Sequence, residues 1–276
     1  MANIKLTIEY EGTNYIGWQK QNKGNSIQGE IEKAIKLVTG ENINLIGSGR
    51  TDSGVHAKGQ VANFITKSKI PEDKFKFALN SKLPRDIAIV DSEKVNENFH
   101  ARYDALGKRY KYLIYNSQIR SPLYRNFAYH LSYPLDYGEM ENAIKFLIGT
   151  HDFTSFMASN SNVKSTIRTI NDVSLYKKED LIVFSIEGNG FLYNMVRIIV
   201  GTLVDVGRGK IKSSSVPYII SSKNREVSGP TAPPQGLYLE KVYYWLKYVL
   251  TLILPCIRIY KSVWKAPELF INSTLE

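Results

Sequence analysis

A chain of 276 residues is long enough to bury a substantial core and to form one or two domains. Its 36 Lys and Arg outnumber its 26 Asp and Glu, and the net charge of +10 favours a polyanionic partner, nucleic acid before an anionic membrane. The single cysteine, Cys256, excludes an intrachain disulfide and a cysteine-rich zinc site. The N-terminal residues lack the apolar core of a signal peptide, so we expect a cytoplasmic protein.

Residues 1–104 have the order of strands and helices that is typical of a ferredoxin-like unit, βαββαβ. Ser26 is a plausible N-cap for the first helix, and Gly40 stands where that helix should end. Pro71 begins the second helix, and Pro84 lies just beyond its end. The expected elements are Ile4–Tyr10, Ser26–Val38, Ile43–Ile46, Gln60–Thr66, Pro71–Leu83 and Ile87–Val95.

Residues 105–244 repeat this order, although no repeat is visible in the sequence itself. Two strands are expected to form a hairpin around the polar turn at residues 178–180. The expected elements are Arg109–Tyr115, Asp136–Ile148, Val173–Lys177, Leu181–Glu187, Phe191–Val206, Ser213–Ser222 and Leu237–Tyr244. The pattern predicts an α+β protein made of two ferredoxin-like halves, residues 1–104 and 105–244, which are joined near Asn98–Leu106.

Residues 245–276 differ in character from the rest of the chain. They contain the dense apolar run YVLTLILPCI, Tyr248–Ile257, but Lys247, Pro255 and Arg258 interrupt any window of the ~20 residues that a membrane span needs. An additional packed element, a contact with a membrane or partner, and a non-native extension all stay open for this tail.

The segment GSGRTDSGVHAKGQ, residues 47–60, places four glycines around one carboxylate, Asp52. A phosphate-binding loop would need glycine where Asp52 stands. A metal site would need a third ligand besides Asp52 and His56, and Ser53 lacks the G-x-S-x-G context of a nucleophile. By spacing alone, a structural turn is a more common role for this segment than catalysis.

An RNA-binding module of the RRM type is a second possibility, because it shares the βαββαβ order. Its RNP1 pattern begins with Lys or Arg, then Gly and an aromatic residue. The segment KGQVANF, Lys58–Phe64, begins correctly, but Gln60 replaces the aromatic residue that would stack on a base. The non-catalytic RNA-binding protein remains our alternative interpretation.

The segment GSGRTDSGVHAKGQVANF closely resembles the catalytic segment of the tRNA pseudouridine synthase A family. Further segments that resemble the family follow in the expected order between Ile4 and Tyr244, whereas residues 245–276 fall outside the pattern. They are IEYEGTNYIGWQKQ (Ile8–Gln21), SIQGEIEKAI (Ser26–Ile35), NFHARYDALGKRYKYLIYN (Asn98–Asn116), HDFTSF (His151–Phe156), GFLYNMVRIIVGTLVDVG (Gly190–Gly207) and GLYLEKVYY (Gly236–Tyr244).

This resemblance implies an isomerase that converts uridine to pseudouridine in the anticodon arm of tRNA, at tRNA positions 38 to 40. It implies that the enzyme works without a metal or an organic cofactor, and that it is a homodimer in which both subunits contribute to basic clefts for tRNA. The implied fold consists of two ferredoxin-like halves that share one extended antiparallel sheet, the pseudouridine synthase fold. A uridine C5-methyltransferase is disfavoured because that reaction needs a cysteine nucleophile, and the only thiol lies in the tail.

The resemblance also implies roles for single residues. Asp52 would be the catalytic carboxylate, which attacks the base, attacks ribose C1′ or promotes a glycal-like route. Arg50 would occupy the space that the flipped nucleotide leaves, and Arg197 would pair with the carboxylate, so we expect a lowered pKa for Asp52. Tyr110 would stack on the uracil and assist proton removal from C5, and Leu237 would line the pocket. Basic residues that flank the motifs are candidate phosphate contacts: Lys20, Lys23, Lys58, Lys108, Arg109 and Lys111.

Overall fold

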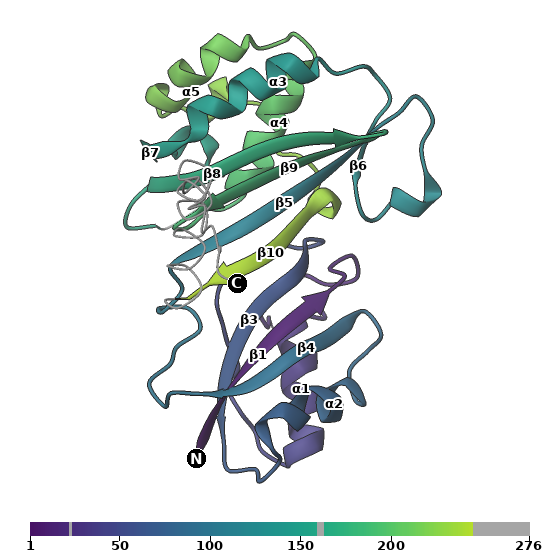
Figure 1. The fold of residues 1–276 in the computed structure, drawn as a ribbon, viewed down its shortest axis with the longest axis vertical. Coiled ribbons are helices and arrows are strands. Elements are labelled where there is room, and N and C mark those ends of the chain that lie inside the picture. The colour runs from purple at the N-terminus through teal and green to yellow at the C-terminus, as the bar shows by residue number, and fades with distance from the viewer. Residues whose placement is uncertain (22–23, 159–162, 245–276) are drawn as a thin grey trace, which may run out of the picture.

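The computed structural model describes residues 1–21, 24–158 and 163–244 (Figure 1). The expectations for Lys23 and for the tail, residues 245–276, therefore lie outside the described residues. Within the described part of the chain, no helix is long and apolar enough to cross a membrane.

One large sheet runs through the molecule, with the strand order β4-β1-β3-β10-β5-β9-β8-β7. The elements before β5 form the lower part of the molecule in Figure 1, and those from β5 onward form the upper part, together with the returning strand β10. In each part the helices pack against the sheet, and buried side chains from both parts join one continuous core. The α+β class and the two βαββαβ units expected from the sequence are confirmed.

The first unit follows the predicted order closely. Its helix α1 begins after Ser26, whose side chain accepts a hydrogen bond from the Gly29 N–H, and ends at Gly40, which has a φ of 76°. The elements are β1 (Ala2–Tyr10), α1 (Ile27–Thr39), β2 (Ile46–Gly47), β3 (His56–Thr66), α2 (Phe75–Asn80) and β4 (Ile87–Val95).

Three predicted boundaries in this unit are wrong. The strand expected over Ile43–Ile46 is limited to Ile46 and Gly47, which pair with Asn63 and Ala62 of β3. The strand expected over Gln60–Thr66 begins at His56, because its first residues pair with β1 and with β10 (Leu237–Tyr243). Residues 56–60 therefore belong to a strand and not to the glycine-rich loop. The helix expected over Pro71–Leu83 consists of a 3-10 turn, Glu72–Lys74, followed by the short helix α2.

The second unit adds two short strands that the sequence did not predict, β6 and β7. Both are defined by their hydrogen bonds to longer strands. β6 pairs with β5 in the parallel direction, and β7 pairs with β8 in the antiparallel direction. The elements are β5 (Gly107–Asn116), β6 (Tyr129–Leu131), α3 (Tyr137–Ile144), β7 (Gly149–Asp152), β8 (Ile167–Lys178), β9 (Leu181–Gly188), α4 (Met195–Gly207), α5 (Val216–Ser222) and β10.

The two units meet where β10 lies beside β3. Tyr238 and Leu239 pair there with His56 and Ala57 in the parallel direction, so the sheet is mixed and not antiparallel throughout. The antiparallel direction expected for the shared sheet holds for the long strands inside each half but is wrong at this junction. This junction brings the glycine-rich loop, which precedes β3, next to elements of the second unit.

Candidate active site

The loop that carries Asp52 joins β2 to β3 and is held by the segment that follows β1. The Trp18 N–H donates to the Thr51 carbonyl oxygen at 3.1 Å, and the Gly54 N–H donates to that of Tyr15 at 3.3 Å. The hydroxyls of Tyr10 and Thr51 are 2.7 Å apart and share a hydrogen bond inside the protein. These bonds fix the backbone on both sides of Asp52, so its carboxylate has a defined position.

Two glycines allow this close approach of backbone to backbone. Gly17 has a φ of +105°, and a Cβ atom added to it would lie 2.5 Å from the carbonyl oxygen of Thr51. Gly54 has a φ of +76°, and an added Cβ would lie 2.9 Å from Cγ of Pro234. Positive φ values cost little only at glycine. The glycines around Asp52 thus serve a tight packing arrangement that involves both units.

Arg197, in the first turn of α4, lies beside Asp52. Its Nη1 is 3.7 Å from Oδ2 of Asp52, and the two side chains are 15% and 27% exposed. The guanidinium is oriented by two further bonds, from Nε to the Ala232 carbonyl oxygen at 2.7 Å and from Nη1 to Oδ1 of Asn194 at 2.8 Å. The Asp52 carboxylate, the Ala232 carbonyl oxygen and Oδ1 of Asn194 thus give this cation three partners.

The pKa of Asp52 differs in direction from our expectation. Burial raises the pKa of this carboxyl above its ordinary value, and the nearby charge of Arg197 lowers it only in part. The expectation counted an adjacent arginine but not the loss of hydration. Arg50 contributes no counter-charge, because it is exposed and makes no ion pair within the described residues.

Tyr110 lies on β5 and is buried, with 8% of its surface exposed. Its ring packs edge-on against Phe191, with centroids 5.1 Å apart. Burial raises the pKa of Tyr110, and the charges of Tyr10 and Asp52 raise it further, so the phenol stays neutral at physiological pH. Leu237 is also buried and begins β10, where it pairs with Tyr112, the second residue after Tyr110.

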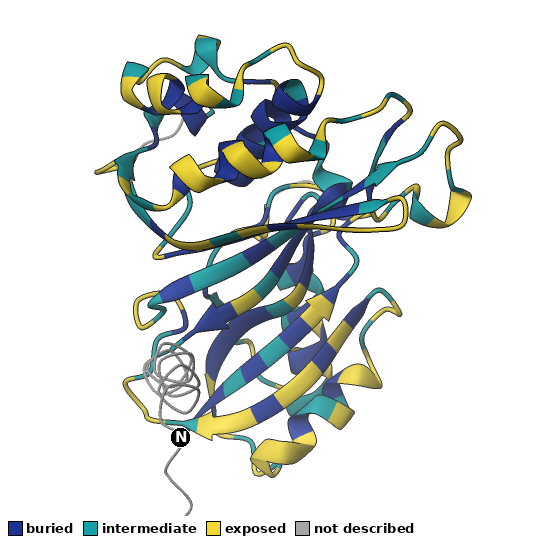
Figure 2. Ribbon diagram, turned by 45° about the horizontal axis from the view of Figure 1, so that its top comes forward, coloured by how far each residue is buried: buried dark blue, intermediate teal, exposed yellow. Residues whose placement is uncertain are grey.

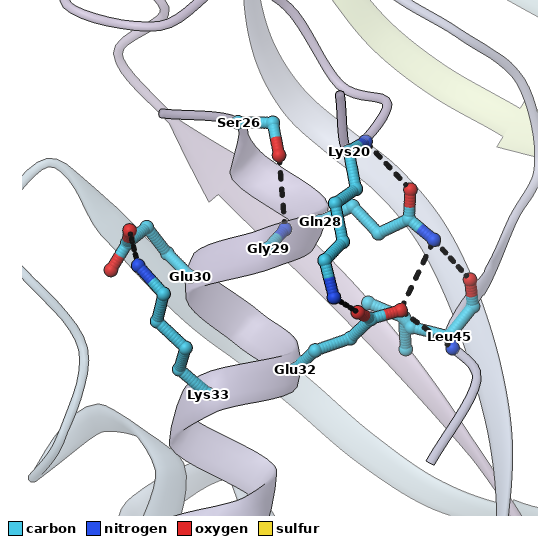
Figure 3. Close-up of polar contacts among 8 residues, drawn as sticks. All are labelled: Lys20, Ser26, Gln28, Gly29, Glu30, Glu32, Lys33 and Leu45. Carbon is cyan, nitrogen blue, oxygen red and sulfur yellow. Dashed lines mark hydrogen bonds and ion pairs between the residues drawn. The ribbon is translucent and has the colours of Figure 1, made fainter. Parts of the chain in front are cut away.

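The basic residues expected to contact phosphate fall into two groups. Lys58, like Arg50, is exposed and forms no ion pair with any described residue. The other candidates that the structure describes have partners within the protein. Lys20 pairs with Glu32 at 3.2 Å (Figure 3), Arg109 with Glu187 at 2.7 Å, and Lys111 with Glu240 at 2.8 Å.

Lys108 has a different environment from the other lysines. Its Nζ donates to the Ser48 carbonyl oxygen at 3.0 Å and lies against Gly49, so the amine supports the loop that carries Asp52. Burial lowers the pKa of Lys108 to about 8, and the charge of Arg102 also contributes. In this structure Lys108 contacts the loop backbone, whereas we expected a solvent-facing phosphate contact.

His56 supports the site in a way that the sequence analysis missed. The Gly12 N–H donates to its Nδ1 at 3.0 Å, so the proton is on Nε2, which faces the carbonyl oxygens of Asn126 at 2.9 Å and Gln235 at 3.2 Å. Burial lowers the pKa of this histidine and favours the neutral ring. Its position four residues after Asp52 was the only available signal, and we considered it only as a metal ligand.

The described residues contain no group of three or more His, Cys, Asp or Glu side chains that could hold a metal ion. What the site contains is one ionisable carboxylate, a fixed guanidinium and a buried phenol. These groups suit chemistry that needs a nucleophile or base and a neutral hydrogen-bond donor.

Comparison with known proteins identifies the family. The family profile described as tRNA pseudouridine synthase matches residues 6–104 and 143–245. The tRNA pseudouridine synthase A of Acetivibrio thermocellus is 57% identical over 244 residues, which are 88% of this chain and 100% of that protein. That of Thermoanaerobacter sp. is 56% identical over the same shares, and the tRNA pseudouridine synthase A 2 of Clostridium perfringens is 52% identical.

The chain belongs to the tRNA pseudouridine synthase family, whose members are isomerases that modify tRNA. The resemblance seen in the sequence is therefore confirmed. A crystal structure of an archaeal box H/ACA sRNP Nop10-Cbf5 complex aligns over 73% of this chain and 43% of that chain, with a TM-score of 0.35 and 10% identity, a likeness too weak to carry an argument.

Proposed function

We propose that this enzyme isomerises uridine to pseudouridine in the anticodon arm of tRNA, at positions 38 to 40 of the tRNA. The observation that carries the proposal is the Asp52 carboxylate, held by a fixed loop 3.7 Å from the guanidinium of Arg197. The names of these relatives support tRNA as the substrate. We also propose a cytoplasmic homodimer, in which residues 1–104 and 105–244 form the two structural units of each subunit.

The reaction breaks the bond between N1 of uracil and C1′ of ribose and forms a bond between C5 and C1′. C5 loses a proton and N1 gains one, so no electrons are gained or lost overall. Asp52 acts as the nucleophile or base in this exchange, and the guanidinium of Arg197 favours the ionised form of Asp52. Tyr110 stacks on the uracil and assists removal of the proton from C5. Its phenol is neutral before that step. Leu237 contributes an apolar wall for the base.

The target base must leave its stack before it reaches Asp52, at a cost of a few kcal/mol. Arg50 extends from the same loop and has no ion-pair partner among the described residues, so it is available to fill the space that the base leaves. Lys58 is available to phosphate for the same reason. Lys108 acts on the RNA indirectly, because its amine holds the backbone of the loop. Arg109 and Lys20 reach phosphate only after they leave Glu187 and Glu32.

The experiment that tests the proposal is tritium release from tRNA labelled at C5 of uridine. We expect Asp52→Ala to reduce release by more than about 10³-fold, because the acid that starts the exchange is gone. The variant should still bind tRNA. Full turnover by Asp52→Ala would refute the catalytic assignment, and binding without turnover by the wild-type enzyme would favour the non-catalytic RNA-binding protein.

A further inference from the structure

A second concave site lies beside the loop that carries Asp52, under the chain segment between β5 and β6. It is a pocket of about 520 Å³. Figure 1 shows β6 and the beginnings of β10 and β3 toward the same end of the strands, on the right of the view. In Figure 2, the projecting segment before β6 has exposed residues at its tip. Six of the lining residues carry the argument: Tyr115, Arg120, Tyr124, Arg125, His130 and Gln235.

Aromatic rings form one wall of the pocket. Tyr115 and Tyr124 stack with centroids 5.1 Å apart and an interplanar angle of 30°, and Tyr115 lies 5.9 Å from the ring of His130. The Nε2 of His130 is 2.9 Å from the Ser117 carbonyl oxygen, which fixes that ring. Tyr124 is only half-buried, so part of its ring faces solvent. Such stacked rings are the usual platform for an unpaired nucleobase.

Positive charge lies at the rim of the pocket. Arg120 and Arg125 are exposed, and neither makes an ion pair with a described residue. No Asp or Glu is among the residues that line the pocket. A planar guanidinium binds phosphate through two parallel hydrogen bonds and also stacks on bases. A pocket with aromatic rings, two arginines without ion-pair partners among the described residues and no lining carboxylate suits a nucleotide better than it suits a cation or an acidic peptide.

The pocket shares a wall with the proposed active site. Gln235, which lines it, accepts the hydrogen bond from Nε2 of His56 together with Asn126. Three residues before Gln235, the Ala232 carbonyl oxygen holds Nε of Arg197. The same short segment therefore orients the guanidinium beside Asp52 and closes the pocket. An RNA strand with its target uridine at Asp52 would pass directly by this second site.

We propose that this pocket binds an unpaired nucleotide of the tRNA substrate near the target uridine, with its base against Tyr124 and its phosphate between Arg120 and Arg125. The inference rests on the proposed function, since it needs tRNA as the ligand. It assigns substrate recognition to the segment between β5 and β6, outside the loop that carries Asp52.

Three variants and one matched control test the pocket. Tyr124→Ala removes the stacking ring, and Tyr124→Phe keeps it. Arg120→Ser with Arg125→Ser removes two charges at the rim. Lys67→Ser with Lys69→Ser removes two exposed charges just beyond the far end of β3, on the order of 30 Å from His56 along an 11-residue strand. Tritium release and the Kd for tRNA would be measured for each at several salt concentrations.

We expect Tyr124→Ala to weaken tRNA binding by roughly 5-fold to 100-fold, and Tyr124→Phe to retain most of the affinity. The double arginine variant should weaken binding and reduce the slope of log K against log salt by about 2. The double lysine control should change neither affinity nor slope in this way. Ultraviolet cross-linking of bound tRNA to the wild-type enzyme should yield RNA-linked peptides from residues 115–130.

Wild-type affinity and turnover in both Tyr124→Ala and the double arginine variant would overturn the proposal. If light scattering shows that these variants form an oligomer of different mass from wild type, the proposal would also be overturned, because the pocket would then be a contact between copies of the chain. If Tyr124→Ala melts at a lower temperature than wild type, the double arginine variant decides, since both of its residues are exposed. Failure of the wild-type enzyme to release tritium would instead refute the proposed function. Tritium release therefore tests the proposed function, and the Kd values of the variants test the pocket.

Discussion

Two opposing effects set the pKa of Asp52, and substitution of Arg197 changes one of them. Burial raises the pKa of the carboxyl, and the guanidinium at 3.7 Å lowers it in part. The reaction needs the ionised form, so activity should fall as the pH drops through this raised pKa. We expect Arg197→Gln to raise the pKa further, because the lowering charge is lost, and to move the acidic limb of kcat/KM to higher pH.

Arg197→Lys is the control for this pH profile. It retains the positive charge while losing the bond from Nε to the Ala232 carbonyl oxygen. We expect a lower kcat in this variant, with the acidic limb closer to wild type than in Arg197→Gln. An acidic limb that is identical in all three enzymes would mean that another group controls the profile.

The sequence could indicate the partner of Arg197 but not those of most other basic residues. The resemblance to the family implied that Arg197 pairs with the catalytic carboxylate, and in the structure the two groups are 3.7 Å apart. Arg109 pairs with Glu187 because the register of β5 and β9 places these two residues opposite each other. Register between residues 78 positions apart is not encoded in local spacing. The burial that changes the pKa of Asp52 also depends on distant parts of the chain and could not be foreseen.

At the scale of single elements, the start of α1 offers a direct stability test. Oγ of Ser26 accepts a hydrogen bond from the Gly29 N–H at 3.2 Å (Figure 3). Two further side chains of α1, those of Gln28 and Glu32, form hydrogen bonds with the backbone of Lys20 and Leu45, which lie outside the helix. We expect Ser26→Ala to lower the free energy of unfolding by about 1 kcal/mol, because the helix loses its N-cap. Urea denaturation followed by circular dichroism would measure this.

Ser26→Gly is the matched variant, since glycine at an N-cap position costs only a few tenths of a kcal/mol relative to serine. Equal destabilisation by both substitutions would show that packing of the buried side chain, and not the cap, is what Ser26 contributes.

Local patterns predicted the capped and alternating elements and misplaced those that depend on tertiary contacts. The strand over Ile87–Val95 agrees with the structure, and the limits of α1 agree to within one residue at each end, because hydrophobic periodicity and helix caps are encoded in neighbouring residues. Helix α4 begins at Met195 and not at Phe191, since Asn194 has a φ of 58° and breaks an apolar pattern that continues through it. Strands β6 and β7 have only three and four residues, too few for a periodic signal.

At the scale of the whole molecule, the fold assembles one site from distant parts of the chain. Asp52 precedes β3, Tyr110 lies on β5 and Arg197 on α4. They converge because β10 joins the two units by pairing with both β3 and β5. The repeated βαββαβ order was visible in the sequence, but the parallel contact at this junction depends on how the units pack and had no local signal.

The net charge of +10 leads to a prediction about tRNA binding by the intact enzyme. Each phosphate contact releases counterions, so log K should fall linearly with log salt, with a slope of about −0.9 for each contact in a duplex region and about −0.7 in a single strand. Fluorescence titrations at several salt concentrations would measure the slope. Binding that stays flat between ~50 and ~200 mM salt would argue against an electrostatic tRNA site.

The last prediction concerns residues 245–276, which lie outside the described part of the chain. The family profile ends at residue 245, and relatives such as that of Acetivibrio thermocellus are covered over their whole length by 244 residues of this chain. Asp52, Tyr110, Arg197 and Leu237 all precede this point, and Tyr244 donates a hydrogen bond to the Ala101 carbonyl oxygen at 2.6 Å. We therefore expect a chain that ends after Tyr244 to fold and to release tritium from labelled tRNA at the wild-type rate. A truncated enzyme with an unchanged melting curve but no tritium release would show that the tail takes part in the reaction or in holding tRNA, and comparison of its Kd with that of the full chain would separate these two roles.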